Sequence, residues 1–185
     1  YKVPANIPDE HVALIEVLSI GCHAKNRAKV QPDDTIVIWG SGKVGLCILQ
    51  AVRTVTDNTV FMVDILDERL ALGPKYYNNV IAINAEKENP VERIKKETDG
   101  KGVDIAFEAV GHAAEIENGV NPVRGCIQAV SGGGKICVLG LGNEPAPVVF
   151  KELIWKEATI VSSRVSHGEF EEAIEHLKHG RLKPE

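Results

Sequence analysis

The chain has 185 residues, of which 44% are hydrophobic and 25% are charged, and its formal net charge is -5. These values are typical of one globular domain with a substantial core, and the acidic excess gives no electrostatic reason to expect nucleic acid as a partner. No apolar run reaches the ~20 residues of a membrane span, so we expect no membrane partner either.

Four cysteines are scattered along the chain without any Cys-x-x-Cys pair: Cys22, Cys47, Cys126 and Cys137. Isolated cysteines in apolar segments behave as small buried hydrophobes, which predicts a reducing compartment and a cytoplasmic location. The only methionine is Met62, so no initiator residue begins the chain. We therefore expect a fragment of a longer protein.

The first predicted element is an amphipathic helix from Asp9 to about Val30, in which apolar residues recur at helical spacing behind a capping aspartate. Residues 1–34 thus form a lead-in and linker helix. Residues 35–39 are β-branched and aromatic, which is typical of a buried parallel strand. This strand leads directly into the sequence Gly40-Ser41-Gly42-Lys43-Val44-Gly45.

Each glycine of this turn has its own predicted role. Gly40 lets the chain turn sharply, Gly42 lets backbone approach a phosphate, and Gly45 lets the following helix pack against the sheet. The helix that opens at Lys43 presents unpaired amides and its positive dipole end to an anion. The spacing therefore predicts a dinucleotide site.

The next strand, residues 59–63, is followed by Asp64, about 20 residues beyond the glycine turn, where dinucleotide-binding domains carry an acid. This carboxylate can accept hydrogen bonds from both ribose hydroxyls of NAD, and its charge would repel the additional phosphate of NADP. We therefore expect NAD as the cofactor. The alternative is that Asp64 only forms the turn at the strand end.

Strands and helices continue to alternate along the rest of the chain. Further strands are predicted at 80–83, 103–107, 135–139 and 158–161, and helices at 43–52, 67–72 (ended by Gly73-Pro74), 90–98, 112–130 (interrupted by Gly119, Pro122 and Gly125), 150–155 and 168–179. This pattern predicts an α/β doubly wound parallel sheet, a Rossmann fold, of about six strands with helices on both faces.

Several motifs spread over nearly the whole chain resemble the cofactor-binding domain of the medium-chain, zinc-type alcohol dehydrogenases, in particular the polyol and threonine dehydrogenase branch. They are Ala13-Leu14-Ile15-Glu16 with Gly21-Cys22-His23-Ala24, the turn from Trp39 to Gly45, Asp64 with Arg69, Gly102-Val103-Asp104 with Phe107-Glu108-Ala109-Val110-Gly111, and Gly133-Gly134-Lys135 through Gly140.

The resemblance implies a set of cofactor-binding residues: Gly40, Gly42, Lys43, Val44, Gly45, Asp64, Arg69, Val110, Leu139 and Leu141. Val44 would back the nicotinamide ring, and Arg69 would lie beside the adenosine ribose. Each also has a plainer interpretation, since Arg69 fits a solvated helix face and Val110 fits an ordinary core position.

Glu16 is similar to the acidic position that stands at or near the catalytic zinc in this branch. Its apolar neighbours suggest a buried carboxylate, which needs a cation or donor, but Val17 replaces the proline that usually follows. The other zinc ligands of the family belong to a GroES-like catalytic domain that this chain lacks. We expect neither a complete zinc site nor a catalytic residue here.

The function implied by the resemblance is the NAD-binding half of a zinc-dependent dehydrogenase that oxidises a small secondary alcohol or polyol. The resemblance also implies a homo-oligomer, a dimer or a tetramer. We expect the isolated chain to bind NAD and to oxidise no alcohol. The alternative from another functional class is a regulatory module that senses NAD without catalysis.

Overall fold

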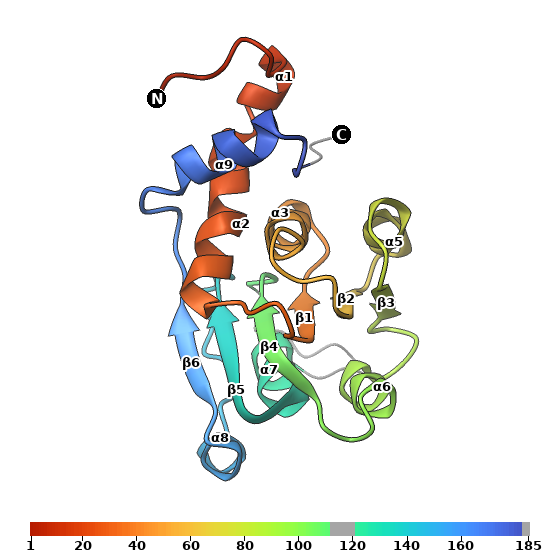
Figure 1. Ribbon diagram of the computed structural model, residues 1–185. Helices are drawn as coiled ribbons and strands as arrows, with labels where there is room; N and C mark the ends of the chain where they lie inside the picture. Colours follow the sequence, from red (N-terminus) through yellow and green to blue (C-terminus); the bar gives the residue numbers. More distant parts are fainter. Residues whose placement is uncertain (112–120, 183–185) are drawn as a thin grey trace.

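The computed structural model describes residues 1–111 and 121–182 (Figure 1). Its strands are β1 (Ile36–Trp39), β2 (Val60–Asp64), β3 (Val80–Asn84), β4 (Val103–Glu108), β5 (Val130–Val138) and β6 (Thr159–Ser162). Its helices are α1 (Asp9–Val12), α2 (Ile15–Ala28), α3 (Lys43–Val52), α4 (Asp67–Leu70), α5 (Leu72–Tyr76), α6 (Pro90–Glu97), α7 (Pro122–Ala129), α8 (Phe150–Lys156) and α9 (Glu169–Lys178).

The strands form one sheet in the order β3-β2-β1-β4-β5-β6, and each neighbouring pair is parallel. The order reverses beside β1, which has β2 on one side and β4 on the other. The predicted doubly wound parallel sheet is therefore confirmed. In such sheets a ligand binds outside the carboxyl ends of the strands where the order reverses.

Helices cover both faces of the sheet, as predicted (Figure 1). Val37 and Trp39 of β1 pack into a core with α6 and α7, whereas Ile36 and Ile38 pack into a second core with α2 and α3. Successive side chains of a strand point to opposite faces, and helices cover both faces of β1, so every residue of this strand is buried.

Two predicted helices are divided in the structure. The helix expected from Asp9 to Val30 is α1 followed by α2, because Leu14 N bonds to His11 O, three residues back, in the turn between them. Pro8, and not Asp9, is the N-cap of α1. Gly73-Pro74, expected to end a helix, lies instead inside α5, where proline is tolerated in the first turn.

The predicted helix 112–130 is described only from its second half onward, and its residues 112–120, with the expected interruption at Gly119, lie outside the described part. Pro122 does not interrupt a helix but begins α7, and the Asn121 side chain caps this helix by accepting from Val123 N and Arg124 N. Likewise β5 begins at Val130, five residues before the predicted strand.

In the described part of the chain, none of the helices combines the length and the apolar character needed to cross a bilayer. All four cysteines are buried and free, as expected. Burial raises the pKa of three of these thiols, Cys22, Cys47 and Cys137, to about 12. These buried thiols stay protonated and are poor nucleophiles and poor metal ligands.

Candidate functional site

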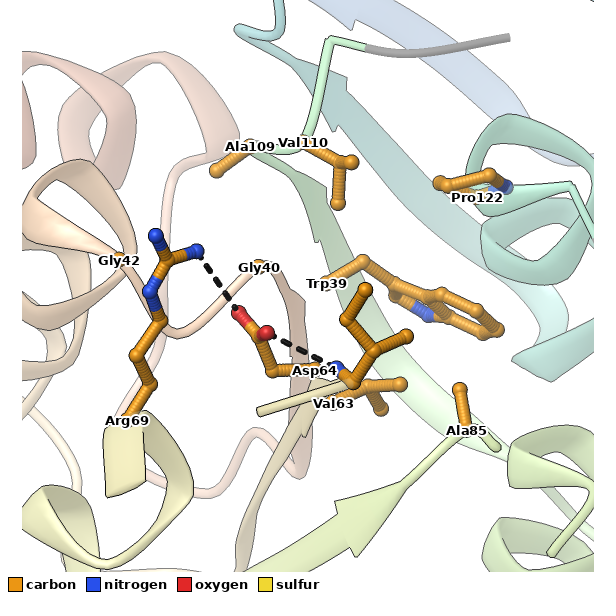
Figure 2. Close-up of a pocket in the computed structure, with 11 residues that line it drawn as sticks. Trp39, Gly40, Gly42, Val63, Asp64, Arg69, Ala85, Ala109, Val110 and Pro122 are labelled. Carbon is orange, nitrogen blue, oxygen red and sulfur yellow. Dashed lines mark hydrogen bonds and ion pairs between the residues drawn. The ribbon is translucent and has the colours of Figure 1, made fainter. Parts of the chain in front are cut away.

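A cavity of about 440 Å³ opens at the carboxyl ends of β1, β2 and β4, at the reversal of strand order (Figure 2). The described residues that line it come from the glycine turn, from the ends of these strands and of β3, and from α4 and the start of α7: Trp39, Gly40, Gly42, Val63, Asp64, Ile65, Arg69, Ala85, Ala109, Val110 and Pro122. The walls are mainly apolar, with one carboxylate and one guanidinium.

The glycine turn has the geometry that its sequence predicts. Gly40 has a φ of +97°, a conformation that glycine adopts without strain. A Cβ on Gly45 would lie 1.8 Å from Gly40 O, so α3 packs onto the turn only because Gly45 has no side chain. A Cβ on Gly42 would meet only Arg69 Nη1, at 3.9 Å, so the backbone there faces open space.

The first turn of α3 has unpaired amides close to this opening. Gly42 is the N-cap, no side chain caps the helix, and no acidic residue lies in its first turn. The first hydrogen bond back to the turn runs from Leu46 N to Gly42 O at 2.9 Å, so the preceding amides lack an intrahelical acceptor. This end of α3 can therefore bind an anion.

Asp64 joins the end of β2 to the glycine turn. Its Oδ2 accepts a hydrogen bond from Ser41 N at 2.7 Å, and its Oδ1 accepts from Ile65 N at 2.8 Å and Leu66 N at 3.1 Å. The side chain is only 6% exposed, and Arg69 Nη1 lies 3.9 Å from Oδ2 (Figure 2). Two carboxylate oxygens offer about four acceptor positions, so one remains for a ligand hydroxyl.

Glu108, at the end of β4, holds the opposite rim of the site in shape. This buried side chain accepts from Val110 N at 2.8 Å and from Gly111 N at 3.0 Å. Its backbone oxygen accepts from Leu139 N and Gly140 N, which ties β4 to the end of β5. Hydrogen bonds donated to Glu108 thus fix the rim that carries Val110.

The structure brings five of the residues expected to bind the cofactor together around the cavity: Gly40, Gly42, Asp64, Arg69 and Val110. The other five lie outside its lining: Lys43, Val44, Gly45, Leu139 and Leu141. Of these, Gly45 is buried beneath the turn, and Val44 and Leu139 pack partly against the core shared with α2 and α3.

Glu16 does not have the environment expected from its neighbours, because its side chain is exposed near the start of α2. The amphipathic helix buries Ile15 and Val17 but turns Glu16 outward, so burial gives no reason for a bound cation. Among the described residues no group of three His, Cys, Asp or Glu side chains could hold a metal ion. These residues alone therefore do not fit a zinc site.

Several lining residues were not expected from the sequence, namely Trp39, Val63, Ile65, Ala85, Ala109 and Pro122. Ile65 follows the acid at the end of β2, and Ala85 follows the end of β3, so the rule that ligands bind at carboxyl ends of strands gives a signal for both. Pro122 has no such signal, because only the packing of α7 brings it to the cavity.

The sequence profile described as zinc-binding dehydrogenase matches residues 44–179. The sorbitol dehydrogenase of Bacillus subtilis is 34% identical over 144 residues, which cover 78% of this chain and 38% of that protein. The chain spans about half the length of other curated relatives that it matches.

Solved structures agree with the sequence match. An Escherichia coli oxidoreductase of unknown specificity superimposes with a TM-score of 0.90 and 30% identity over 100% of this chain and 50% of that one. An E. coli CFT073 alcohol dehydrogenase complexed with NADH gives a TM-score of 0.87 and 25% identity, covering 100% of this chain and 52% of its own. The family profile spans well over half of the sequence, and the chain belongs to the zinc-binding dehydrogenase family.

Proposed function

We propose that this chain is the NAD-binding half of a zinc-dependent dehydrogenase that oxidises a small secondary alcohol or polyol. The observation that carries the proposal is the bond from Ser41 N to Asp64 Oδ2, which holds the carboxylate beside the glycine turn and so supports its proposed role as the ribose acceptor. The sorbitol dehydrogenase and the NADH-complexed relative support the same activity and cofactor.

In this proposal the described residues bind and orient the dinucleotide. The amides at the start of α3 hold the pyrophosphate, and the remaining acceptor position of Asp64 accepts from one ribose hydroxyl rather than from both. Arg69 lies beside that ribose, Val110 lies over the base, and Val44, Leu139 and Leu141 lie toward the nicotinamide end. Bound NAD would supply the hydride acceptor, and the chain itself would contribute position and one wall of the cleft.

The zinc of this proposal needs ligands from another part of the protein, because the described residues do not hold a complete group of ligands. We assign residues 1–185 to the dinucleotide-binding domain, with residues 1–34 as its lead-in, and the remaining ligands to a GroES-like catalytic domain. Glu16 is the one candidate ligand of this chain, and its exposure leaves it accessible to another domain. The described residues contain no group of side chains that could hold a metal ion, so we assign no catalytic role to the isolated chain.

The cofactor assignment is tested by calorimetric titration of the wild-type chain, Asp64→Asn and the control Asp67→Ala with NADH and NADPH. Asp67 is a nearby carboxylate that is 66% exposed and pairs with Lys87. We expect the wild type to prefer NADH by at least about tenfold, Asp64→Asn to lose most of this preference, and Asp67→Ala to keep it. Equal affinity of the wild type for both cofactors would remove the argument from charge repulsion.

The division into two domains is tested by activity. The purified 185-residue chain should oxidise no polyol with or without added zinc, whereas the longer protein that supplies the missing ligands should do so. Zinc-dependent oxidation of sorbitol by the isolated chain would overturn this part of the proposal. The zinc-binding dehydrogenase profile and the sorbitol dehydrogenase support catalysis over the alternative of an NAD-sensing module.

We further infer a homo-oligomer that forms through the edge strand β6. Among the described strands β6 pairs only with β5, so it is an edge strand of this sheet, and Ile160 within it is exposed. The neighbouring helix α8 exposes Phe150, Ile154 and Trp155. Light scattering should give a dimer or tetramer for the wild type and a monomer for Ile160→Lys, and a wild-type monomer would contradict the inference.

Our proposal also includes a cytoplasmic location, which the four buried, free thiols support.

A further inference from the structure

The indole of Trp39 carries a polar group that no described residue satisfies. Trp39 is 1% exposed, and its Nε1 has no hydrogen-bond partner among the described residues. A buried N–H without an acceptor destabilises a protein, and such groups are rare in native structures. The position therefore calls for an acceptor that residues 1–111 and 121–182 do not supply.

The indole also lines the cavity that we assign to the nucleotide. Its six-membered ring packs onto α7, because a Cβ on Gly125 would lie 2.4 Å from Trp39 Cη2. Figure 2 shows the indole nitrogen on the ring edge away from Pro122, on the side of Val63 and Ala85. Gly125 thus fixes the ring, and the buried edge of the ring that carries the N–H faces the side of Val63 and Ala85, which also line the cavity.

An acceptor in this place would belong to the base of the dinucleotide. In the proposed function Asp64, Arg69 and the glycine turn hold the ribose at one end of the cavity. The rest of the lining is apolar and includes Val63, Ile65, Ala85 and Pro122. A purine fits such a wall through its faces, and it carries three unprotonated ring nitrogens, N1, N3 and N7, on its edges. Trp39 Nε1 is the neutral side-chain donor among the lining residues.

Building on the proposed function, we propose that Trp39 Nε1 donates a hydrogen bond to a ring nitrogen of the adenine and so selects a base with an acceptor at that position. The bond forms only in the complex, so it adds to affinity without adding to the stability of the free chain. Trp39 is then a specificity-determining residue of the adenosine end.

The first test observes the indole proton directly. The chain has two tryptophans, and Trp155→Phe assigns their two indole N–H signals because Trp155 is 79% exposed on α8. Titration with ADP-ribose should move the Trp39 signal to lower field, as expected for a new hydrogen bond, and leave the Trp155 signal unchanged. An unmoved Trp39 signal at saturation would overturn the proposal.

The second test removes acceptors from the ligand and the donor from the protein. Of the 1-deaza, 3-deaza and 7-deaza adenine analogues of ADP-ribose, one should bind about 5- to 20-fold more weakly to the wild type, which is the loss expected for one hydrogen bond. Trp39→Phe should bind all four ligands alike, and it should bind nicotinamide mononucleotide, which lacks adenosine, as the wild type does. Equal binding of the three analogues by the wild type would also overturn the proposal.

The wild-type titrations keep the test decisive if Trp39→Phe does not fold. They also distinguish a failure of the proposed function from a failure of the role given to Trp39. If neither ADP-ribose nor NADH binds, the proposed function itself is wrong. If both bind while the indole signal and the analogue affinities stay unchanged, only the role of Trp39 is wrong.

Discussion

The carboxyl end of the sheet holds a buried carboxylate and the contact between α2 and α9 holds two partly buried ones, and their hydrogen-bond partners differ. Asp64 accepts its hydrogen bonds from backbone amides, including Ser41 N at 2.7 Å. In the second contact, Glu172 accepts from Lys25 and Asn26 of α2. Glu169 accepts from His23 of α2 at 2.9 Å and, in addition, from the amide of His167.

This difference separates a binding group from a structural one. A carboxylate held by backbone amides keeps its place without a side-chain partner, so it can offer its remaining acceptor position to a ligand. A carboxylate held by side chains of another helix uses its acceptor positions to join the two helices. We therefore expect changes at the sheet end to alter nucleotide binding, and changes at the α2–α9 contact to alter stability alone.

The largest expected effect is the loss of stability on adding a side chain to Gly45, and Gly42 of the same turn is its control. Gly45→Ala should lower the free energy of unfolding by more than about 3 kcal/mol and abolish NADH binding, because its Cβ would lie 1.8 Å from Gly40 O. Gly42→Ala should unfold like the wild type, since its Cβ meets only Arg69, but should weaken NADH binding by crowding the phosphate. Thermal unfolding and calorimetry measure both effects, and wild-type stability of Gly45→Ala would refute the packing argument.

The second prediction concerns acid stability. Burial raises the pKa of Glu169, but hydrogen bonds from His23 and from the amides of His167 and Glu169 outweigh it and lower the pKa to about 2. A lowered pKa stabilises the fold above the unfolded value of about 4.5, and this stabilisation is lost as the pH falls from about 5 toward 2. The loss due to this group should be on the order of 3 kcal/mol.

Denaturant unfolding of the wild type and Glu169→Gln across this pH range measures the effect. The two stability curves should converge at the acid end, because a protonated Glu169 resembles the amide. NADH affinity at pH 7 should be the same for both. A constant difference between the curves from pH 5 to 2 would count against the assigned titration.

The third prediction removes the partner of a buried ammonium. Glu172→Ala leaves Lys25, which is 8% exposed, without its carboxylate and should lower the free energy of unfolding by about 2 kcal/mol at unchanged NADH affinity. Glu175→Ala, on the same helix, is the control, because Glu175 is 55% exposed and should change stability by less than about 0.5 kcal/mol. Weaker NADH binding by Glu172→Ala would remove the distinction between the two regions.

The smallest expected effect is that of Arg69→Ala. Arg69 is 52% exposed and 3.9 Å from Asp64, so its loss should weaken NADH binding by less than about fivefold and leave thermal unfolding unchanged. Calorimetry at two salt concentrations checks this expectation, because the contribution of an exposed charge should fall with salt. A loss as large as that of Asp64→Asn would mean that the guanidinium, rather than the carboxylate, dominates the site.

Local sequence patterns predict the elements of this fold well where one pattern acts alone. The β-branched run before Gly40 predicts β1. The spacing between the glycine turn and Asp64 predicts that the two lie close together, and the hydrogen bond from Ser41 N to Asp64 confirms this contact. The prediction is less accurate where two patterns compete. Continuous helical spacing hides the turn between α1 and α2, and Gly73-Pro74 suggests an end where α5 continues.

The sequence by itself determined the alternation of strands and helices, the glycine turn and the acid that joins it, because these features follow from short-range periodicity and from the missing Cβ of glycine. Only the tertiary structure decided that Glu16 faces outward, that Pro122 reaches the cavity, and that Trp39 keeps an unsatisfied donor there. The physical reason is that burial and hydrogen-bond satisfaction depend on neighbours distant in the chain. Gly125, 86 positions after Trp39, is the contact that fixes its ring.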